Sequence, residues 1–202
     1  MKPCTERSRD NGTMRVIAGT YRSRQLTAPS GARTRPTSDR LRETLFNIVA
    51  PRIAGARFAD LYAGTGAVGI EALSRGADHI YFAEKAAPAV AAIRANLGAL
   101  GIDAGYSIEP RGTATLLDTL TKSATPLNLI FLDPPWEADA EYTATLQFLG
   151  SPRASSVLAP DALIIAEHTS RTPLLTRYGN LAQNRTLVQG DAALTFYKTS
   201  AG

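Results

Sequence analysis

Four consecutive residues carry the clearest chemical signal in this 202-residue chain: Asp133, Pro134, Pro135 and Trp136, which follow directly on the apolar run 127–132. The prolines fix the backbone and donate no N–H, so the corner offers acceptors, the Asp133 carboxylate and the Pro134 carbonyl. Trp136 adds a flat stacking face. Two acceptors beside a ring match a planar base that carries an exocyclic NH2 group. The alternative is a rigid turn with Trp136 in the core.

An exocyclic amine of this kind is a weak nucleophile, because its lone pair is delocalised into the ring. Acceptors on both hydrogens would favour a tetrahedral nitrogen, whose localised lone pair could attack an activated methyl group. Catalysis would then consist mainly of alignment and of stabilising the positive charge that develops on the amine. This chemistry needs no metal, and His79 and His168 are isolated in the sequence, so we expect no metal site.

A glycine-rich loop follows an earlier apolar run. Gly64, Gly66 and Gly69 fit the G-x-G-x-x-G pattern, and Glu84 ends the next apolar run, 18 residues after Gly66. This arrangement suits a ligand that contains adenosine, with the backbone close to the ligand and the acid on the ribose hydroxyls. Asp60 would repel a pyrophosphate but attract a cation such as the amino group of S-adenosylmethionine (SAM). A plain strand–helix turn capped by Asp60 is the structural alternative.

These residues need a sheet that brings strand ends together. From residue 57 onward, apolar runs alternate with helical patterns, which predicts a Rossmann-like α/β fold with a mostly parallel sheet of seven strands and an antiparallel C-terminal hairpin. The expected strands are 58–63, 79–84, 106–110, 128–133, 162–167, 181–188 and 192–198, and the expected helices are 65–75, 87–100, 113–120 and 140–149. Ligands of such sheets bind beyond the carboxyl ends of the strands, so the corner and the glycine loop would share one rim.

The front end of the chain is strongly basic. Through Arg57 it contains 12 Lys and Arg against 4 Asp and Glu, and the remainder contains 10 against 14, which gives the net charge of +4. Such a front end predicts a polyanionic partner, with Arg22 and Arg24 among its contacts. We expect a disordered leader at 1–13, a small β-hairpin at 14–36 and the main domain at 37–202, beginning with a helix capped by Thr37 or Ser38.

Two motifs in this order, DLYAGTG at 60–66 and DPPW at 133–136, resemble class I SAM-dependent methyltransferases that modify amino nitrogens. Further segments extend the resemblance from Met14 to about Lys198: MRVIAGTYRSRQL, TRPTSDRLRETLFNIV and GDAALTFYK. With them the chain is similar to the RsmD family, the bacterial 16S ribosomal RNA guanine-N2 methyltransferases. The resemblance implies a seven-stranded methyltransferase fold preceded by a hairpin that grips RNA. It also implies 16S rRNA or the assembled small subunit as substrate. The single cysteine, Cys4, allows no internal disulfide and suits a reducing cytoplasm, and we expect a monomer.

The resemblance assigns roles to individual residues. The SAM pocket would be shaped by Asp60, Ala63, Gly64, Gly66, Gly69 and Glu84, the target guanine would be held by Asp133, Pro134, Pro135 and Trp136, and RNA and cofactor would be bordered by Arg35, Pro36, Thr37, Asp39 and Arg40. The chain departs from the family twice. Where the family has an acid for the adenine amine, this chain has Thr113, so either Thr113 or the backbone makes that contact. Trp136 replaces the usual Phe or Tyr.

Three other functions explain part of the pattern. A DNA base amino-methyltransferase could use the same corner, although the small hairpin and the lack of an extended recognition insert argue against it. A nicotinamide-dependent dehydrogenase would account for the glycine loop and Glu84, but not for Asp60 or for residues 133–136. A non-catalytic RNA-binding module would bind RNA without regard to any cofactor. We therefore expect SAM as cofactor and RNA as partner.

Overall fold

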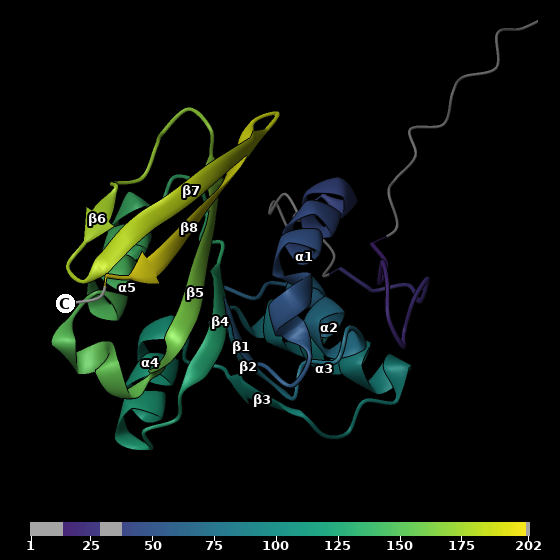
Figure 1. Ribbon diagram of the computed structural model, residues 1–202. Helices are drawn as coiled ribbons and strands as arrows, with labels where there is room; N and C mark the ends of the chain where they lie inside the picture. The colour runs from purple at the N-terminus through teal and green to yellow at the C-terminus, as the bar shows by residue number, and fades with distance from the viewer. Residues whose placement is uncertain (1–13, 29–37, 201–202) are drawn as a thin grey trace, which may run out of the picture.

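The computed structural model describes residues 14–28 and 38–200. Within them the chain forms one sheet in the order β3-β2-β1-β4-β5-β8-β7-β6, and Figure 1 shows helices on both of its faces. The strands are β1 (Arg57–Leu61), β2 (His79–Ala83), β3 (Tyr106–Glu109), β4 (Leu127–Leu132), β5 (Leu158–Thr169), β6 (Arg177–Tyr178), β7 (Leu181–Gln189) and β8 (Ala192–Thr199). The first five strands are parallel, and β8 runs antiparallel to β5 and β7.

The predicted Rossmann-like fold is confirmed, including the antiparallel C-terminal hairpin. The predicted count of seven strands is wrong by one, because Arg177 and Tyr178 form the short strand β6 against Ala182 and Leu181 of β7. A two-residue strand is too short to show any periodicity in the sequence.

The helices are divided between the two faces of the sheet. They are α1 (Asp39–Ile53), α2 (Ala67–Ser74), α3 (Ala87–Leu100), α4 (Thr113–Lys122) and α5 (Asp139–Leu149), with a 3₁₀ turn, η1, at Pro152–Ser156. One apolar core joins α1, α2 and α3 to the sheet, and a second joins α4 and α5 to its other face. None of the helices in the described part of the chain is long and apolar enough to span a membrane.

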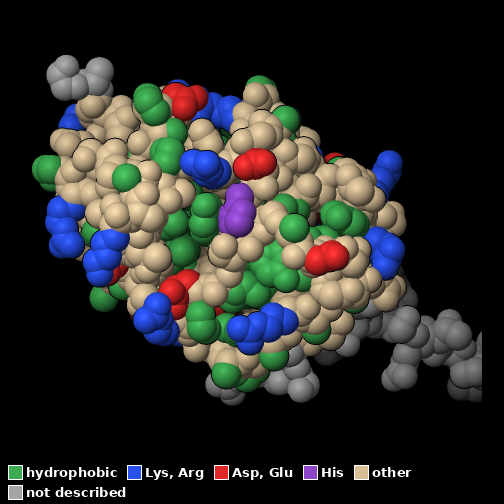
Figure 2. Space-filling model, turned by 90° about the horizontal axis from the view of Figure 1, so that it is seen from below, with side chains coloured by type: hydrophobic (Ala, Val, Ile, Leu, Met, Phe, Trp, Pro, Cys, Tyr) green, Lys and Arg blue, Asp and Glu red, His purple; other side chains and the backbone are tan. Residues whose placement is uncertain are grey.

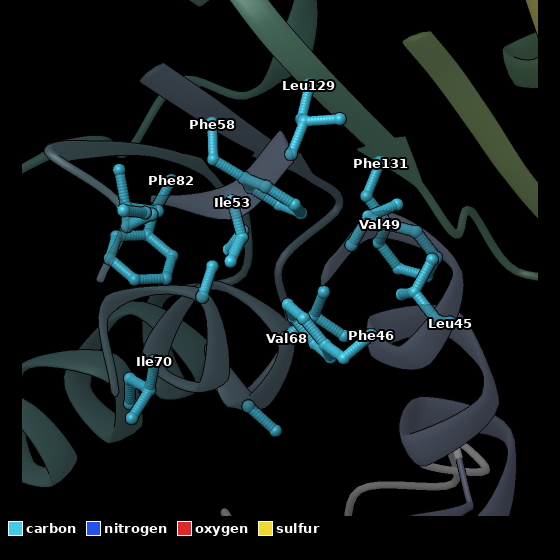
Figure 3. Close-up of a cluster of buried hydrophobic side chains, with 14 of the residues drawn as sticks. Leu45, Phe46, Val49, Ile53, Phe58, Val68, Ile70, Phe82, Leu129 and Phe131 are labelled. Carbon is cyan, nitrogen blue, oxygen red and sulfur yellow. The ribbon is translucent and has the colours of Figure 1, made fainter. Parts of the chain in front are cut away.

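The first core explains why the alternating pattern of the sequence folds into layers. Figure 3 shows Phe46 and Val49 of α1 against Phe58 of β1 and Phe131 of β4. All four side chains are at most 1% exposed. Burying an aliphatic or aromatic side chain of this size contributes roughly 1.5–3 kcal/mol. The core thereby fixes the strand ends that carry the candidate site.

The start of α1 is set by a serine cap. Ser38 Oγ accepts a hydrogen bond from Leu41 N at 3.2 Å, and Asp39 lies in the first turn. This arrangement satisfies one of the free N–H groups at the helix start and places a negative charge at the positive end of the helix dipole. The predicted cap is therefore confirmed at Ser38, whereas Thr37 lies outside the described residues.

Residues 14–28 form the N-terminal hairpin, with a shorter ladder than the sequence suggests. One antiparallel bridge joins Arg15 to Gln25. Val16 and Leu26 are 1% and 6% exposed, because they enter the same core as α1 and α2. This packing means that deleting the hairpin would open the main core. The predicted leader at 1–13 and the predicted junction between hairpin and main domain near residue 36 lie outside the described residues.

Candidate active site at the carboxyl rim of the sheet

The register of three neighbouring strands sets the geometry of the rim. Leu61, the last residue of β1, pairs with Ala83 of β2 and with Leu132 of β4. The next residue along β2 is Glu84 and the next along β4 is Asp133. With strands ~4.8 Å apart, the ends of β2 and β4 lie about 10 Å from each other across β1. The predicted cofactor acid and the predicted base-binding corner thus flank the glycine loop.

The glycine loop adopts a conformation that requires glycine. Gly64 and Gly66 have φ values of 54° and 76°, in the left-handed region, and Gly66 is the N-cap residue of α2. Gly69 serves another purpose, because a Cβ there would lie 2.2 Å from Cε1 of Phe82 in β2. The first two glycines therefore shape the loop, and the third lets α2 pack closely on the sheet.

Glu84 is tied directly to this loop. Its Oε2 accepts a hydrogen bond from Gly64 N at 2.9 Å, and its Oε1 accepts one from Ala86 N at 2.8 Å. A carboxylate has lone pairs beyond these two bonds, so a ligand hydroxyl can still be accepted. The acid predicted to hold a ribose is thus fixed in position by the loop that would hold the rest of the ligand.

Asp60 lies beneath the loop and is 2% exposed. Its Oδ2 accepts a hydrogen bond from Gly69 N in the first turn of α2 at 2.8 Å. Burial raises the pKa of Asp60 to about 8, the Gly69 N–H opposes that shift, and the charge of Glu84 adds to it. Asp60 is therefore a helix cap, as the structural alternative proposed, and its buried carboxylate is also suited to a cationic ligand group, which would lower this pKa.

The corner at 133–136 is held through its backbone. Asp133 N donates to Leu61 O at 3.3 Å, and Pro135 O accepts from Ala138 N at 2.7 Å. Pro134 O accepts from the Tyr142 hydroxyl at 3.1 Å. The Pro134 carbonyl, predicted to face a base, is therefore already engaged on one side and keeps one lone pair for a ligand.

Tyr142 is the residue of the corner that sequence reasoning missed. It is 3% exposed on α5, and its hydroxyl also donates to Glu167 O of β5 at 2.7 Å, so its single hydrogen is shared between this carbonyl and that of Pro134. Burial, with the negative charges of Asp133 and Glu167, raises the pKa of Tyr142, so the hydroxyl stays a donor. In the sequence Tyr142 has the spacing of an ordinary apolar core position on a helix. Its hydroxyl, which needs a hydrogen-bond partner when buried, is the only signal of this contact.

Thr113, the predicted substitute for an adenine-contacting acid, begins α4 beyond β3. It is 7% exposed, and its Oγ1 meets no described residue with normal hydrogen-bond geometry, although it is near enough to the Tyr62 hydroxyl to lower that group's pKa. The net effect on Tyr62 is upward, to about 12, because of burial. A buried hydroxyl without a well-formed bond is the kind of group that a polar ligand atom could satisfy.

Comparisons with known proteins bear on the family of the chain. The family described as Conserved hypothetical protein 95 matches residues 14–198. Ribosomal RNA small subunit methyltransferase D of Escherichia coli (strain K12) is 35% identical over 191 residues, which cover 95% of this chain and 92% of the relative. The Bacillus subtilis (strain 168) protein named "Putative rRNA methyltransferase YlbH" is 34% identical over 185 residues, covering 92% and 98%.

The chain belongs to this family, the RsmD methyltransferases. It is a methyltransferase, and its solved relatives share the fold. The Escherichia coli structure named "Putative methyltransferase yhhF" superimposes with a TM-score of 0.79 at 32% identity, covering 95% of this chain and 100% of that one. The resemblance drawn from the motifs is thus confirmed over nearly the whole chain.

A second feature of this RsmD family member is a cavity of about 440 Å³ between the N-terminal hairpin and the start of α1. It is lined by Arg15, Val16, Ile17, Arg22, Ser23, Asp39, Arg40 and Glu43. The cavity brings together Arg22 and Arg40, two of the predicted RNA contacts. Arg24 points elsewhere, since its Nη2 donates to Ala99 O at the end of α3 at 2.9 Å.

Other front-end residues fall outside this cavity. Arg35, Pro36 and Thr37 lie outside the described residues. Arg42, which counted toward the basic front end, is fully buried, and its Nη2 donates to Arg15 O and to Asp39 Oδ1. Figure 2 shows the molecule from below, where the parallel strands begin, and there the basic side chains are interspersed with acidic ones. The cavity lining is also mixed, but its three arginines outnumber Asp39 and Glu43.

Proposed function

We propose that this RsmD family member transfers a methyl group from SAM to the exocyclic N2 amine of a guanine in 16S rRNA. The observation that carries the proposal is the strand register that sets the Asp133 corner and Glu84 on either side of one glycine loop. A relative named for the small ribosomal subunit RNA supports the choice of substrate. We take the enzyme to act as a cytoplasmic monomer on this RNA or on the assembled subunit.

The residues around the glycine loop fit SAM. Glu84 offers its remaining lone pairs to the ribose hydroxyls, and Asp60 offers a buried carboxylate to the cationic amino group. Thr113 Oγ1, without a well-formed bond among the described residues, is available to the adenine amine in place of the family's acid. Bound SAM supplies a methyl group already activated on a sulfonium centre. The loop's own task is to hold the ligand in a fixed place.

The corner residues act on the base. Asp133 and the remaining lone pair of the Pro134 carbonyl accept the two hydrogens of the amine, while Trp136 stacks on the ring. These contacts favour a tetrahedral nitrogen and stabilise its positive charge as the methyl group arrives. The Tyr142 hydroxyl donates to one lone pair of the Pro134 carbonyl, which fixes the direction of the carbonyl's other lone pair. A base must leave its stack to reach this corner, which favours a loop nucleotide as target.

The cavity between hairpin and α1 would receive the RNA backbone. Arg22 and Arg40 lie at its wall with Arg15, and arginine is well suited to phosphate. Asp39 and Glu43 share the wall, and Arg15 Nε lies 3.6 Å from Asp39 Oδ2. The acids would keep the arginines in place without neutralising all of them. Arg24, Arg35 and Thr37 remain predicted RNA contacts, although Arg24 points away from this cavity and the other two lie outside the described residues.

The test combines cofactor binding and methyl transfer. SAM and S-adenosylhomocysteine should raise the melting temperature, NAD should not, and labelled methyl groups should pass to small-subunit RNA but not to duplex DNA. Each of Arg22→Gln and Arg40→Gln should reduce the dependence of log affinity on log salt concentration by about 0.7–0.9. Stabilisation by NAD alone, or transfer to DNA in preference to RNA, would overturn the proposal.

A further inference from the structure

Asn96 on α3 connects two parts of the molecule that bind different ligands under the proposed function. It is 2% exposed. Its Oδ1 accepts a hydrogen bond from Thr27 N at 2.7 Å, and its Nδ2 donates to Thr27 O at 3.1 Å and to Thr65 O at 3.0 Å. The partners fix the orientation of the amide, because a flipped side chain would set its NH2 group against the Thr27 N–H. One buried side chain thus pairs with the end of the N-terminal hairpin and with the glycine loop.

The bond to Thr65 bears on the shape of the glycine loop. The C=O of Thr65 and the N–H of Gly66 belong to one planar peptide unit and point in opposite directions. Asn96 holds the C=O on one side, and Ala63 O accepts from Gly66 N at 2.7 Å on the other. Since Gly64 and Gly66 are the residues best able to change conformation here, this peptide unit is where the loop most needs support.

The hairpin meets the same loop residue at its other end. Thr65 Oγ1 donates to Met14 Sδ at 3.2 Å. Both ends of segment 14–28 therefore contact Thr65, one directly and one through Asn96. Further anchors attach the hairpin to α2 away from the loop. Glu71 accepts from Ile17 N and Ala18 N, and Ser74 Oγ accepts from Tyr21 N and donates to Ala18 O.

We propose that Asn96 is a positioning residue that couples RNA binding at the N-terminal hairpin to cofactor binding at the glycine loop. The inference rests on the proposed function. RNA that holds the hairpin also holds Thr27, and Asn96 passes this restraint to the Thr65 carbonyl, so the loop stays in the conformation that binds the cofactor. By thermodynamic linkage the effect is mutual, and bound cofactor tightens the grip on RNA by the same factor.

The experiment measures this factor in the full chain. Calorimetry gives the dissociation constant of S-adenosylhomocysteine with and without a 16S rRNA transcript, for the wild type, Asn96→Ala and the control Ser74→Ala. Ser74 is a matched control because it is 3% exposed and makes two hydrogen bonds to the same hairpin, yet lies at the far end of α2 from the loop. Thermal melts establish that each variant is folded.

We expect RNA to tighten S-adenosylhomocysteine binding about 5-fold or more in the wild type, a typical allosteric factor. Asn96→Ala should bring the factor to within about 2-fold of unity, and Ser74→Ala should keep it. Should Asn96→Ala not fold, Asn96→Asp replaces it, because it keeps the acceptor for Thr27 N and sets an oxygen against Thr65 O; the same loss is expected.

Three results overturn the inference alone: a wild-type factor near unity, an unchanged factor in the Asn96 variant, or an equal loss in Ser74→Ala. The last would mean that any loosening of the hairpin weakens the coupling. A wild type that binds neither S-adenosylhomocysteine nor RNA overturns the proposed function as well. The two failures are therefore distinguishable.

Discussion

The rim of the sheet has two halves that are built differently. In the cofactor half, the side chains of the acids bond to the backbone around the glycine loop: Asp60 accepts from Gly69 N, and Glu84 accepts from Gly64 N and Ala86 N. In the base half, the corner is tied down through its backbone, by Leu61 O on Asp133 N and by the Tyr142 hydroxyl on Pro134 O.

This difference decides how substitutions are to be interpreted. Removing an acid from the cofactor half takes away hydrogen bonds that shape the loop, so the effects on folding and on binding are combined. Removing the Asp133 side chain takes away neither the bond from Asp133 N to Leu61 O nor the bond from the Tyr142 hydroxyl to Pro134 O. Asp133 is therefore a probe of the base contact, and Glu84 and Asp60 are probes of binding and stability together.

The largest expected effect belongs to the base half. Asp133→Ala should abolish methyl transfer while S-adenosylhomocysteine binds within a few-fold of wild type, because Asp133 addresses the base and not the cofactor. Asp133→Asn should retain part of the activity, since its amide oxygen still accepts one bond. Single-turnover label transfer and calorimetry separate the two effects. Full activity in Asp133→Ala would contradict the role of Asp133 in binding the base, and with it the division of the rim into a cofactor half and a base half.

Glu84→Ala should act on both folding and binding. A hydrogen bond to a charged acceptor contributes roughly 1.5–3 kcal/mol, so losing the ribose contacts should weaken SAM binding by about tenfold or more. The melting temperature should also fall, because Gly64 N and Ala86 N lose their acceptor. Glu84→Gln is the matched control, since it keeps an acceptor and the side-chain volume. Its affinity for SAM and its melting temperature should lie between those of the wild type and of Glu84→Ala. Calorimetry showing unchanged affinity would remove Glu84 from the ribose site.

Asp60 should show its effect in stability rather than in methyl transfer, and that effect depends on pH. Burial raises its pKa to about 8 from the ordinary 3.8, so between these values the folded chain binds a proton that the unfolded chain has released. The resulting stability is complete below the ordinary pKa and is lost as pH rises through the folded pKa. Asn at position 60 keeps an acceptor for Gly69 N and does not ionise.

The advantage of the wild type over Asp60→Asn in free energy of unfolding should therefore shrink between about pH 5 and about pH 8. Urea denaturation at several pH values measures the difference. A difference that stays constant over this range would mean that Asp60 does not titrate there. Saturating S-adenosylhomocysteine should reduce the loss, because its amino group favours the ionised carboxylate.

The fold was predictable because its signals are local. Apolar runs alternating with helical patterns located the parallel strands and helices, and Asp133 and Glu84 followed from strand ends. The contacts that complete the site join residues far apart in the chain. Asn96 reaches Thr27 and Thr65 across 69 and 31 positions. Tyr142 resembles any buried helical aromatic residue until its hydroxyl is found against Pro134.

Charge counting had a similar limit. Composition showed a basic front end but could not tell which arginines face solvent. Arg42 is fully buried and holds Asp39 and the backbone of Arg15, while Arg22 and Arg40 line the cavity. Whether an arginine of α1 is buried or faces solvent depends on which side of the helix packs on the core. Tertiary packing rather than local sequence determines that side.

The most direct test of the central claim identifies the methylated nucleoside. The protein is incubated with methyl-labelled SAM and with small-subunit RNA, both as a transcript and within assembled subunits, and the RNA is then digested to nucleosides for chromatography and mass spectrometry. The account predicts that the label appears as N2-methylguanosine and disappears with Asp133→Ala. Label on a ring nitrogen, on a ribose oxygen or on a base other than guanine would contradict it.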